Sequence, residues 1–106
     1  MSMTVEEALQ FLADTDIPAA KAYALKEGLN FQIKTIEAIE ALKSQHKTAG
    51  DRMHEARSSP AYINIAQKYE EAVLDHETLK NQRSTCEKRF EYWRSKNANR
   101  RQGGSL

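Results

Sequence analysis

The sequence has little of what sheets, disulfides and membrane spans require. Its 106 residues include one cysteine, two prolines and four glycines. A single cysteine excludes an internal disulfide and suits a reducing compartment. The scarcity of turn residues and strand-like runs excludes a sandwich, a barrel or a doubly wound sheet. No apolar run approaches the roughly 18 residues of a membrane span, so we expect a small, all-α protein.

The N-terminal residues also lack the features of a secretory signal. Residues 1–13 include Glu6 and Glu7 and no Lys or Arg, whereas a signal peptide begins with positive charge. We therefore expect a cytoplasmic protein.

Capping residues and apolar spacing predict a short first helix at about residues 5–13. Thr4 precedes it and Glu7 follows three residues later, which is the pattern of a capping box. The segment Asp14-Thr15-Asp16 comes next. Its side-chain oxygens can compete for backbone donors, so we expect it to interrupt the helix and to cap the one that follows.

A long second helix is predicted at about residues 17–57. Apolar residues recur in it every three or four positions from Leu25 to Leu42, and the pattern then becomes sparse. Gly50 lies in the sparse region and is the expected site of any bend.

Ser59 and Pro60 make a strong helix start, as N-cap and first residue. The third helix is predicted at about residues 60–97, with spacings typical of a coiled coil. One helical domain then covers residues 1–97, and residues 98–106 form a flexible basic and polar tail without periodicity.

The short connection at Ser58-Ser59 predicts that the second and third helices form a long antiparallel hairpin. Folding there pairs apolar residues with one another: Ile39 with Leu79, Ile33 with Cys86, Leu29 with Phe90, and Leu25 with Trp93. Arg83 then falls opposite Ile36, beside Glu37 and Glu40. The agreement of two independent apolar patterns supports the hairpin.

The third helix has more apolar residues than one seam needs. The extra face comprises Tyr62, Ile65, Tyr69 and Leu74. Small chains bury too little surface to be stable alone. We therefore predict a homodimer or a higher oligomer through this face; a lone hairpin is the alternative.

Nothing in the sequence points to catalysis, so we expect no enzyme, no cofactor and no metal. His46 and His54 are too far apart along a helix to chelate one ion. Cys86 falls on the predicted seam, where a thiol is most simply a buried apolar residue. No glycine-rich phosphate loop or nucleophile motif is present.

Charge is the informative feature of the sequence. Residues 1–79 have 8 Lys or Arg and 13 Asp or Glu, whereas residues 80–106 have 8 and 2. The candidate nucleic-acid-binding residues are Lys88, Arg89, Arg94, Lys96, Arg100 and Arg101. Cations interleaved with aromatic residues such as Tyr92 and Trp93 can hold phosphates and stack bases. Cations near a helix C-terminus also suit its macrodipole, and Trp93 also suits a core.

The stretch Trp93-Arg94-Ser95-Lys96-Asn97-Ala98-Asn99-Arg100-Arg101 follows a long charged helix. In this it resembles the C-terminal end of small helical proteins encoded by tailed bacteriophages and prophages, which tend to lie among early genes for recombination and DNA metabolism. The resemblance covers about the last third of the chain. It implies an accessory protein of the host-cell cytoplasm that acts on DNA or on a host DNA-processing protein.

Two functional hypotheses follow. In the first, a non-enzymatic protein binds DNA, or a DNA-processing complex, through its basic C-terminal segment during recombination or replication. In the second, an adaptor or inhibitor docks on a host protein through the acidic helical arm. Salt-dependent DNA binding distinguishes the two, because it reports phosphate contacts.

Overall fold

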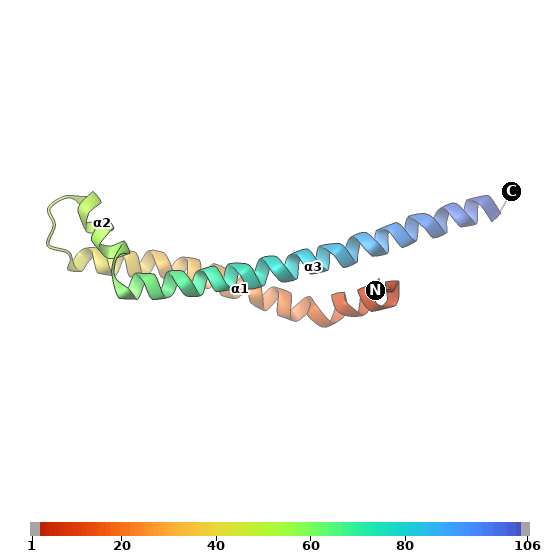
Figure 1. Ribbon diagram of the computed structural model, residues 1–106, viewed down its shortest axis with the longest axis horizontal. Coiled ribbons are helices and arrows are strands. Elements are labelled where there is room, and N and C mark those ends of the chain that lie inside the picture. The colour runs from red at the N-terminus through yellow and green to blue at the C-terminus, as the bar shows by residue number, and fades with distance from the viewer. Residues whose placement is uncertain (1–2, 105–106) are drawn as a thin grey trace. The chain divides into compact units, whose positions relative to one another are not determined.

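The protein is all-α. The computed structural model describes residues 3–104, with side chains as far as Arg101. It has three helices in order: α1 at Val5–Lys43, α2 at Ala49–Arg57 and α3 at Pro60–Gly104 (Figure 1). The helical class and the connection just before Pro60 are as predicted, but several helix boundaries differ.

Two of the three predicted helix starts are confirmed by side-chain hydrogen bonds. Thr4 Oγ1 accepts a 3.1 Å bond from the Glu7 amide and donates a 3.0 Å bond to Glu7 Oε1. Ser59 Oγ accepts a 3.2 Å bond from the Tyr62 amide. Each hydroxyl thus satisfies an amide of the first helical turn that has no partner within the helix.

The predicted interruption at residues 14–16 is wrong, because α1 is continuous through it. The polar side chains bond along the helix rather than to its amides: Thr15 Oγ1 donates to the Phe11 carbonyl at 2.6 Å, and Asp14 Oδ1 accepts from Gln10 Nε2 at 2.7 Å. Pro18 also lies inside α1. Only one amide hydrogen bond is lost to its ring, and the helix continues.

The predicted second helix ends early, at Lys43 rather than Arg57. Residues 44–48 form a loop, and α2 begins after Thr48, whose Oγ1 accepts a 3.1 Å bond from the Asp51 amide. Gly50 lies in the first turn of α2 and is not the bend. The pattern of Thr48 followed three residues later by Asp51 is itself a helix-start signal.

Helix α3 runs to Gly104 and does not end near Asn97. Asn97 stays in the helix by donating its side-chain amide to the Trp93 carbonyl at 3.1 Å. The predicted flexible tail at residues 98–106 is therefore helical over residues 98–104, and residues 105–106 lie outside the described residues.

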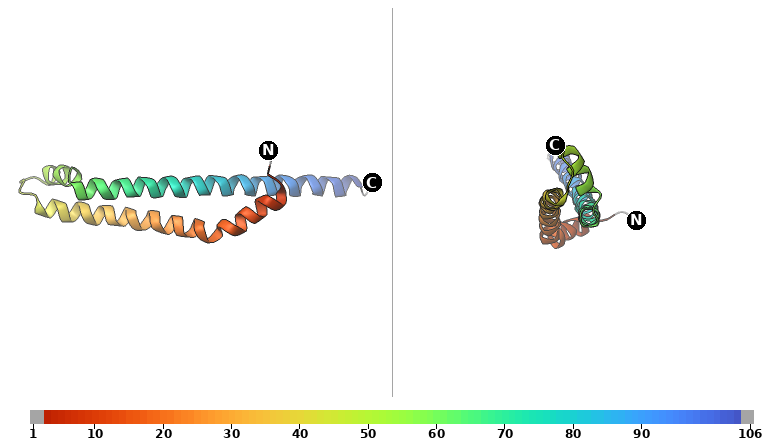
Figure 2. Two further views of the ribbon diagram at one scale, coloured as in Figure 1. Left: turned by 60° about the horizontal axis from the view of Figure 1, so that its bottom comes forward. Right: turned by 90° about the vertical axis from the view of Figure 1, so that its left-hand side faces the viewer.

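The chain divides into two units, each built from parts of α1 and α3. One comprises residues 21–76, and the other comprises residues 1–20 and 77–106. In the unit of residues 21–76, α1 and α3 run antiparallel and α2 lies at the turn between them (Figure 2). Its core consists of Leu29, Ile65 and Ala72, with Ile33, Ile36 and Tyr69 packed against them.

The antiparallel pairing is confirmed, but the predicted register is wrong. Leu29 packs in a cluster with Ala72 and not with Phe90. Tyr23 lies against His76, with ring centroids 5.6 Å apart. The difference arises because the loop and α2 occupy residues 44–57, so that each residue of α1 faces one much earlier in α3 than a tight turn at Ser59 would give.

Polar contacts link α2 to α1 and to the loop of residues 44–48. Arg57 Nε donates to Glu37 Oε2 at 2.7 Å, and this hydrogen bond and the carboxylate charge raise the pKa of Arg57 above its usual range. Glu55 accepts a 2.6 Å bond from Ser44 Oγ and lies 3.3 Å from His46 Nε2. The prediction that Arg83 lies beside Glu37 is therefore wrong: Glu37 is bonded to α2, and Arg83 contacts the start of α1.

In the second unit, the start of α1 packs antiparallel on α3. Arg83 Nη1 donates to the Leu12 carbonyl at 2.8 Å and to Thr15 Oγ1 at 2.6 Å. Cys86 is buried, as predicted, but its sulfur lies 3.7 Å from that of Met3 rather than beside Ile33. These contacts place the first residue of the described chain beside the middle of this part of α3.

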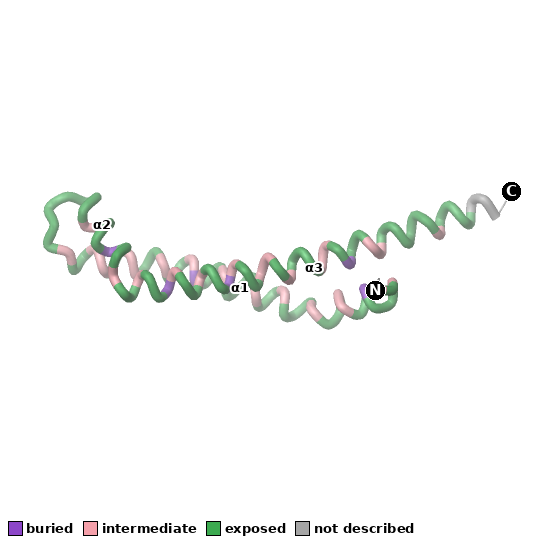
Figure 3. The backbone as a smooth tube through the Cα atoms, viewed as in Figure 1, coloured by how far each residue is buried: buried purple, intermediate pink, exposed green. Residues whose placement is uncertain are grey.

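Few of the described residues are buried (Figure 3). Large apolar side chains remain exposed. The largest exposures are on α1, where Leu42 is 86% exposed and Phe31 is 73% exposed. A surface of this kind favours self-association or partner binding. None of the helices in residues 3–104 combines the length and hydropathy that a membrane span needs.

Candidate nucleic-acid interface

All six predicted nucleic-acid-binding residues lie on the C-terminal part of α3, in residues 88–101. This stretch contains six Lys or Arg and one acid, Glu91. It is continuous helix, so its side chains hold defined positions around one axis. The prediction placed the last of these cations in a flexible tail; the structure places them on a helix.

Helical spacing divides the cations into two neighbouring rows. Arg89, Trp93, Lys96 and Arg100 follow one another by four, three and four residues, which places them along one side of the helix. Phe90, Arg94, Asn97 and Arg101 follow the same spacing on the adjacent side. Lys88 belongs to neither row. No acidic residue falls in either row, so the two together form a cationic surface.

The six cations differ in what they contact. The half-buried Arg89 donates from Nη1 to the Met3 carbonyl and so joins α3 to the chain's N-terminal segment. Arg94 is exposed and lies 3.3 Å from Glu91 Oε1. The side chains of Lys88, Lys96, Arg100 and Arg101 are exposed. Arg89 thus has a structural role, and the others are accessible to a ligand.

Two aromatic rings lie among these cations. The Phe90 and Trp93 rings are stacked, with centroids 6.1 Å apart and planes inclined by 18°. The Arg94 guanidinium lies 5.9 Å from the centroid of the Phe90 ring. Phe90 therefore supports both the indole and a cation. Residue pairs three apart on a helix are neighbours, so the spacing of Phe90 and Trp93 was the sequence signal for this pair.

Trp93 is 46% exposed and is not the core partner of Leu25. The shift in register explains this result, because the contacts of Met3 are with Cys86 and Arg89 of α3, and Leu25 lies much further along α1. Tyr92, the next aromatic residue, is 69% exposed. The largest aromatic side chain of the protein is therefore open to solvent on a cationic helix.

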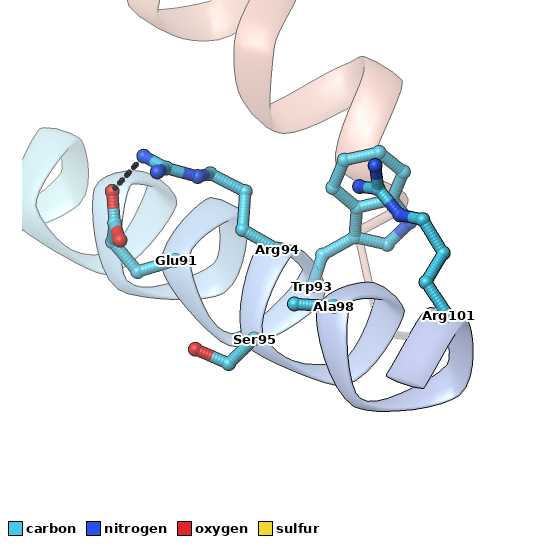
Figure 4. Close-up of a pocket in the computed structure, with 6 residues that line it drawn as sticks. All are labelled: Glu91, Trp93, Arg94, Ser95, Ala98 and Arg101. Carbon is cyan, nitrogen blue, oxygen red and sulfur yellow. Dashed lines mark hydrogen bonds and ion pairs between the residues drawn. The ribbon is translucent and has the colours of Figure 1, made fainter. Parts of the chain in front are cut away.

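A shallow hollow of about 280 Å³ lies along this part of α3 (Figure 4). It is lined by Glu91, Trp93, Arg94, Ser95, Ala98 and Arg101. Figure 4 shows the Trp93 and Arg101 side chains rising on the same side of the helix, with the small Ala98 between them in sequence. The hollow thus combines an aromatic ring with two guanidinium groups.

The four residues of the predicted self-association face do not share one face of α3. Ile65 is 7% exposed and belongs to the core of its own unit, where Tyr69 packs against it. Leu74 is 65% exposed and lies nine residues later, half a turn away from Ile65 around the helix. Tyr62 is half-buried. Ile65 is therefore not available to a second copy of the chain.

The structure shows an exposed, uncharged face on α1 that the sequence analysis did not predict. Its members are uncharged and exposed, and they follow one another by four, three, four, three and four residues: Ala24, Gly28, Phe31, Thr35, Ala38 and Leu42. We call this set the outer row of α1. An apolar row with this spacing is typical of a helix that packs on another helix.

Within residues 3–104, no group of three or more His, Cys, Asp or Glu side chains is arranged to hold a metal ion. Comparisons of the chain with protein-family models, with curated proteins and with solved structures found no match.

Proposed function

We propose that this protein binds nucleic acid through the C-terminal part of α3, as a non-enzymatic accessory protein of the kind that tailed phages encode for recombination or replication. The observation that carries the proposal is the continuous cationic surface of residues 88–101, in which five of the six cations are exposed and exposed aromatic residues lie among them.

The cations have different proposed roles, according to their exposure and contacts. The proposed phosphate contacts are four exposed cations that follow Arg89 on α3: Arg94, Lys96, Arg100 and Arg101. Lys88 lies on another side of the helix and adds to the attraction at longer range. Arg89 is bonded to the Met3 carbonyl and positions the surface.

Neutralising phosphates releases counterions from a nucleic acid, and this release drives binding without sequence preference. The helix macrodipole alone also favours cations near a C-terminus, but only within about the last turn. Lys88 and Arg94 are more than one turn from the end of α3 at Gly104. The macrodipole therefore does not account for the whole cationic stretch.

The distribution of charge gives little support to the alternative, an adaptor that docks through an acidic arm. The unit of residues 21–76 contains eight Lys or Arg and eight Asp or Glu, and so has no net charge. The acidic excess lies in residues 1–20, which have four acids and no Lys or Arg. Those residues belong to the same unit as the basic part of α3.

Self-association of the protein is part of the proposal, through the outer row of α1. A second copy of this row is the proposed partner, because the row is uncharged and its spacing matches that of helix-packing surfaces. At Gly28, an added Cβ atom would lie in open space, with no neighbouring atom within 4 Å. The small residues of the row allow two helix backbones to approach closely.

The function is tested by nucleic-acid binding at low and moderate salt with two variants of equal charge loss. The first replaces Arg94, Lys96, Arg100 and Arg101 with Gln. The control replaces Lys21, Lys34, Lys47 and Lys68, four exposed lysines of the other unit, with Gln. We expect the first variant alone to bind much more weakly, with a salt slope lower by about 1 for each lost phosphate contact. If both variants weaken binding equally, binding follows the net charge of the protein and not this surface, which would contradict the proposed site. The absence of wild-type binding at low salt would contradict the proposed function.

A further inference from the structure

The hollow beside Trp93 distinguishes this surface from a purely electrostatic one. Phosphate contacts need cations alone, whereas this surface includes a large aromatic ring that is 46% exposed. Exposing an indole to water is unfavourable, yet nearly half of Trp93 remains exposed although the Phe90 ring stacks on it. The arrangement therefore points to a ligand with a flat face as well as negative charge.

We propose that the hollow binds an unpaired nucleobase of a single-stranded nucleic acid, with Trp93 as the stacking platform and Arg94 and Arg101 as contacts for the flanking phosphates. This inference rests on the proposed function and makes it more specific, because it selects single strands over duplexes. In a duplex the bases are stacked on one another and their faces are inaccessible, whereas a single strand can turn them outward.

The geometry around Trp93 suits this role. Phe90 stacks on the indole with an inclination of 18° and so fixes the orientation of the platform. Ser95 and Ala98 are small, which leaves the hollow of about 280 Å³ open. Arg94 and Arg101 are seven residues apart, about 10 Å along the helix axis. A cation is thus present toward each end of the hollow.

The one carboxylate of the hollow does not oppose an anionic ligand fully. Glu91 Oε1 lies 3.3 Å from Arg94 Nη1, so its charge is partly compensated before any ligand binds. The pair is exposed, with side-chain exposures of 61% for Arg94 and 65% for Glu91. Exposed pairs of this kind are weak, so Arg94 can exchange the carboxylate for a phosphate at little cost.

Trp93 is the only tryptophan in the chain, so its fluorescence reports on the proposed site directly. The test compares three probes of equal length, about 16 nucleotides: a single strand, the corresponding duplex, and an abasic single strand that keeps the phosphates but has no bases. We expect the single strand to quench the fluorescence and to bind most tightly. The abasic strand should bind more weakly and leave the fluorescence nearly unchanged.

Two variants separate stacking from folding. Trp93→Ala should lower single-strand affinity by roughly 5- to 150-fold, the equivalent of one stacked base, with little effect on duplex or abasic binding. Trp93→Phe should restore part of the loss, because it keeps an aromatic face. Tyr92→Ala is the matched control: Tyr92 is also exposed but does not line the hollow, and its loss should leave the single-strand preference intact. Circular dichroism should show unchanged helicity in all three.

The outcomes distinguish this inference from the function on which it rests. Binding of the duplex as tightly as the single strand, without quenching, would overturn the stacking site and leave nucleic-acid binding in place. An equal loss for all probes in Trp93→Ala would also overturn it. Failure of every probe to bind at low salt would overturn both proposals.

Discussion

Arg83 and Thr15 are 68 residues apart in the sequence, and Arg83 Nη1 donates a hydrogen bond of 2.6 Å to Thr15 Oγ1. The same nitrogen donates to the Leu12 carbonyl at 2.8 Å, and Nη2 lies 3.6 Å from Asp16 Oδ1. The Arg83 side chain is 19% exposed and the Asp16 side chain 80% exposed. One guanidinium thus joins the N-terminal part of α1 to α3 mainly through hydrogen bonds to the less exposed groups.

Replacing Arg83 with Ala should lower the free energy of unfolding by about 1.5–3 kcal/mol, the range for hydrogen bonds that involve a charged group. Asp16→Asn should change it by less than about 1 kcal/mol, because the ion pair is long and exposed. Urea denaturation followed by circular dichroism measures both values. The control is Lys80→Ala, which removes an exposed cation one turn earlier on α3. If it lowers the free energy of unfolding as much as Arg83→Ala does, the effect comes from the loss of a positive charge and not from the hydrogen bonds of Arg83.

The thiol of Cys86 should react slowly in the native protein. Cys86 is 4% exposed and its sulfur lies against that of Met3. Modification by a thiol reagent requires access to the sulfur, so the reaction should become fast only when denaturant opens this unit. The rate of colour release from a disulfide reagent, with and without urea, measures the difference. Fast and complete reaction without urea would show that the N-terminal segment does not cover this part of α3.

Ile65 and Leu74 should respond very differently to truncation. Ile65→Ala removes part of the core and should cost about 2–5 kcal/mol of stability. Leu74→Ala removes a side chain that is 65% exposed and should change stability by at most about 0.5 kcal/mol. Urea denaturation at equal protein concentration provides the comparison. A similar cost at both positions would mean that α3 presents another face to its partner helix.

Local signals in the sequence predicted the helix starts after Thr4 and Ser59 correctly, whereas the start predicted at residue 17 is wrong and the start after Thr48 was not predicted. Thr4 and Ser59 cap helices as expected, because capping needs only residues a few positions away. Thr15 was expected to end a helix, but it bonds to the Phe11 carbonyl within α1. A threonine hydroxyl can either cap a helix end or bond to the carbonyl four residues earlier within a helix. The hydrogen bond from Arg83 to Thr15 favours the second arrangement.

The register of the hairpin could not be obtained from periodicity alone. A helix seam repeats every three or four residues, so two apolar patterns agree in several registers that differ by whole turns. The choice depended on where the chain turns, and the turn lies in residues 44–48, before α2. Once that turn was misplaced, Trp93 was assigned to the core, Arg83 to Glu37 and Ile65 to an outer face. The cations of residues 88–101 lie together on α3 whatever the register, because their proximity depends only on their separation in the sequence.

The last prediction concerns self-association through the outer row of α1. Phe31 and Leu42 are the largest members of this row and are 73% and 86% exposed. Sedimentation equilibrium should therefore show a species larger than the monomer of 12.1 kDa at micromolar concentrations. Phe31→Glu combined with Leu42→Glu should shift it to monomer, because burying an unpaired carboxylate in a helix–helix contact is strongly unfavourable.

The matched control is Leu74→Glu, which introduces the same charge at an exposed apolar residue outside the row and should leave the association unchanged. Gly28→Leu gives a second, independent measurement. Gly28 is exposed and an added Cβ atom there lies in open space, so the variant should keep its helicity, while the bulky leucine side chain holds the two outer rows apart. A wild-type monomer at high micromolar concentration would contradict this interface. If Leu74→Glu alone causes dissociation, the interface between the two copies lies on α3 and not on the outer row of α1. Leu74 is the exposed member of the self-association face predicted on α3.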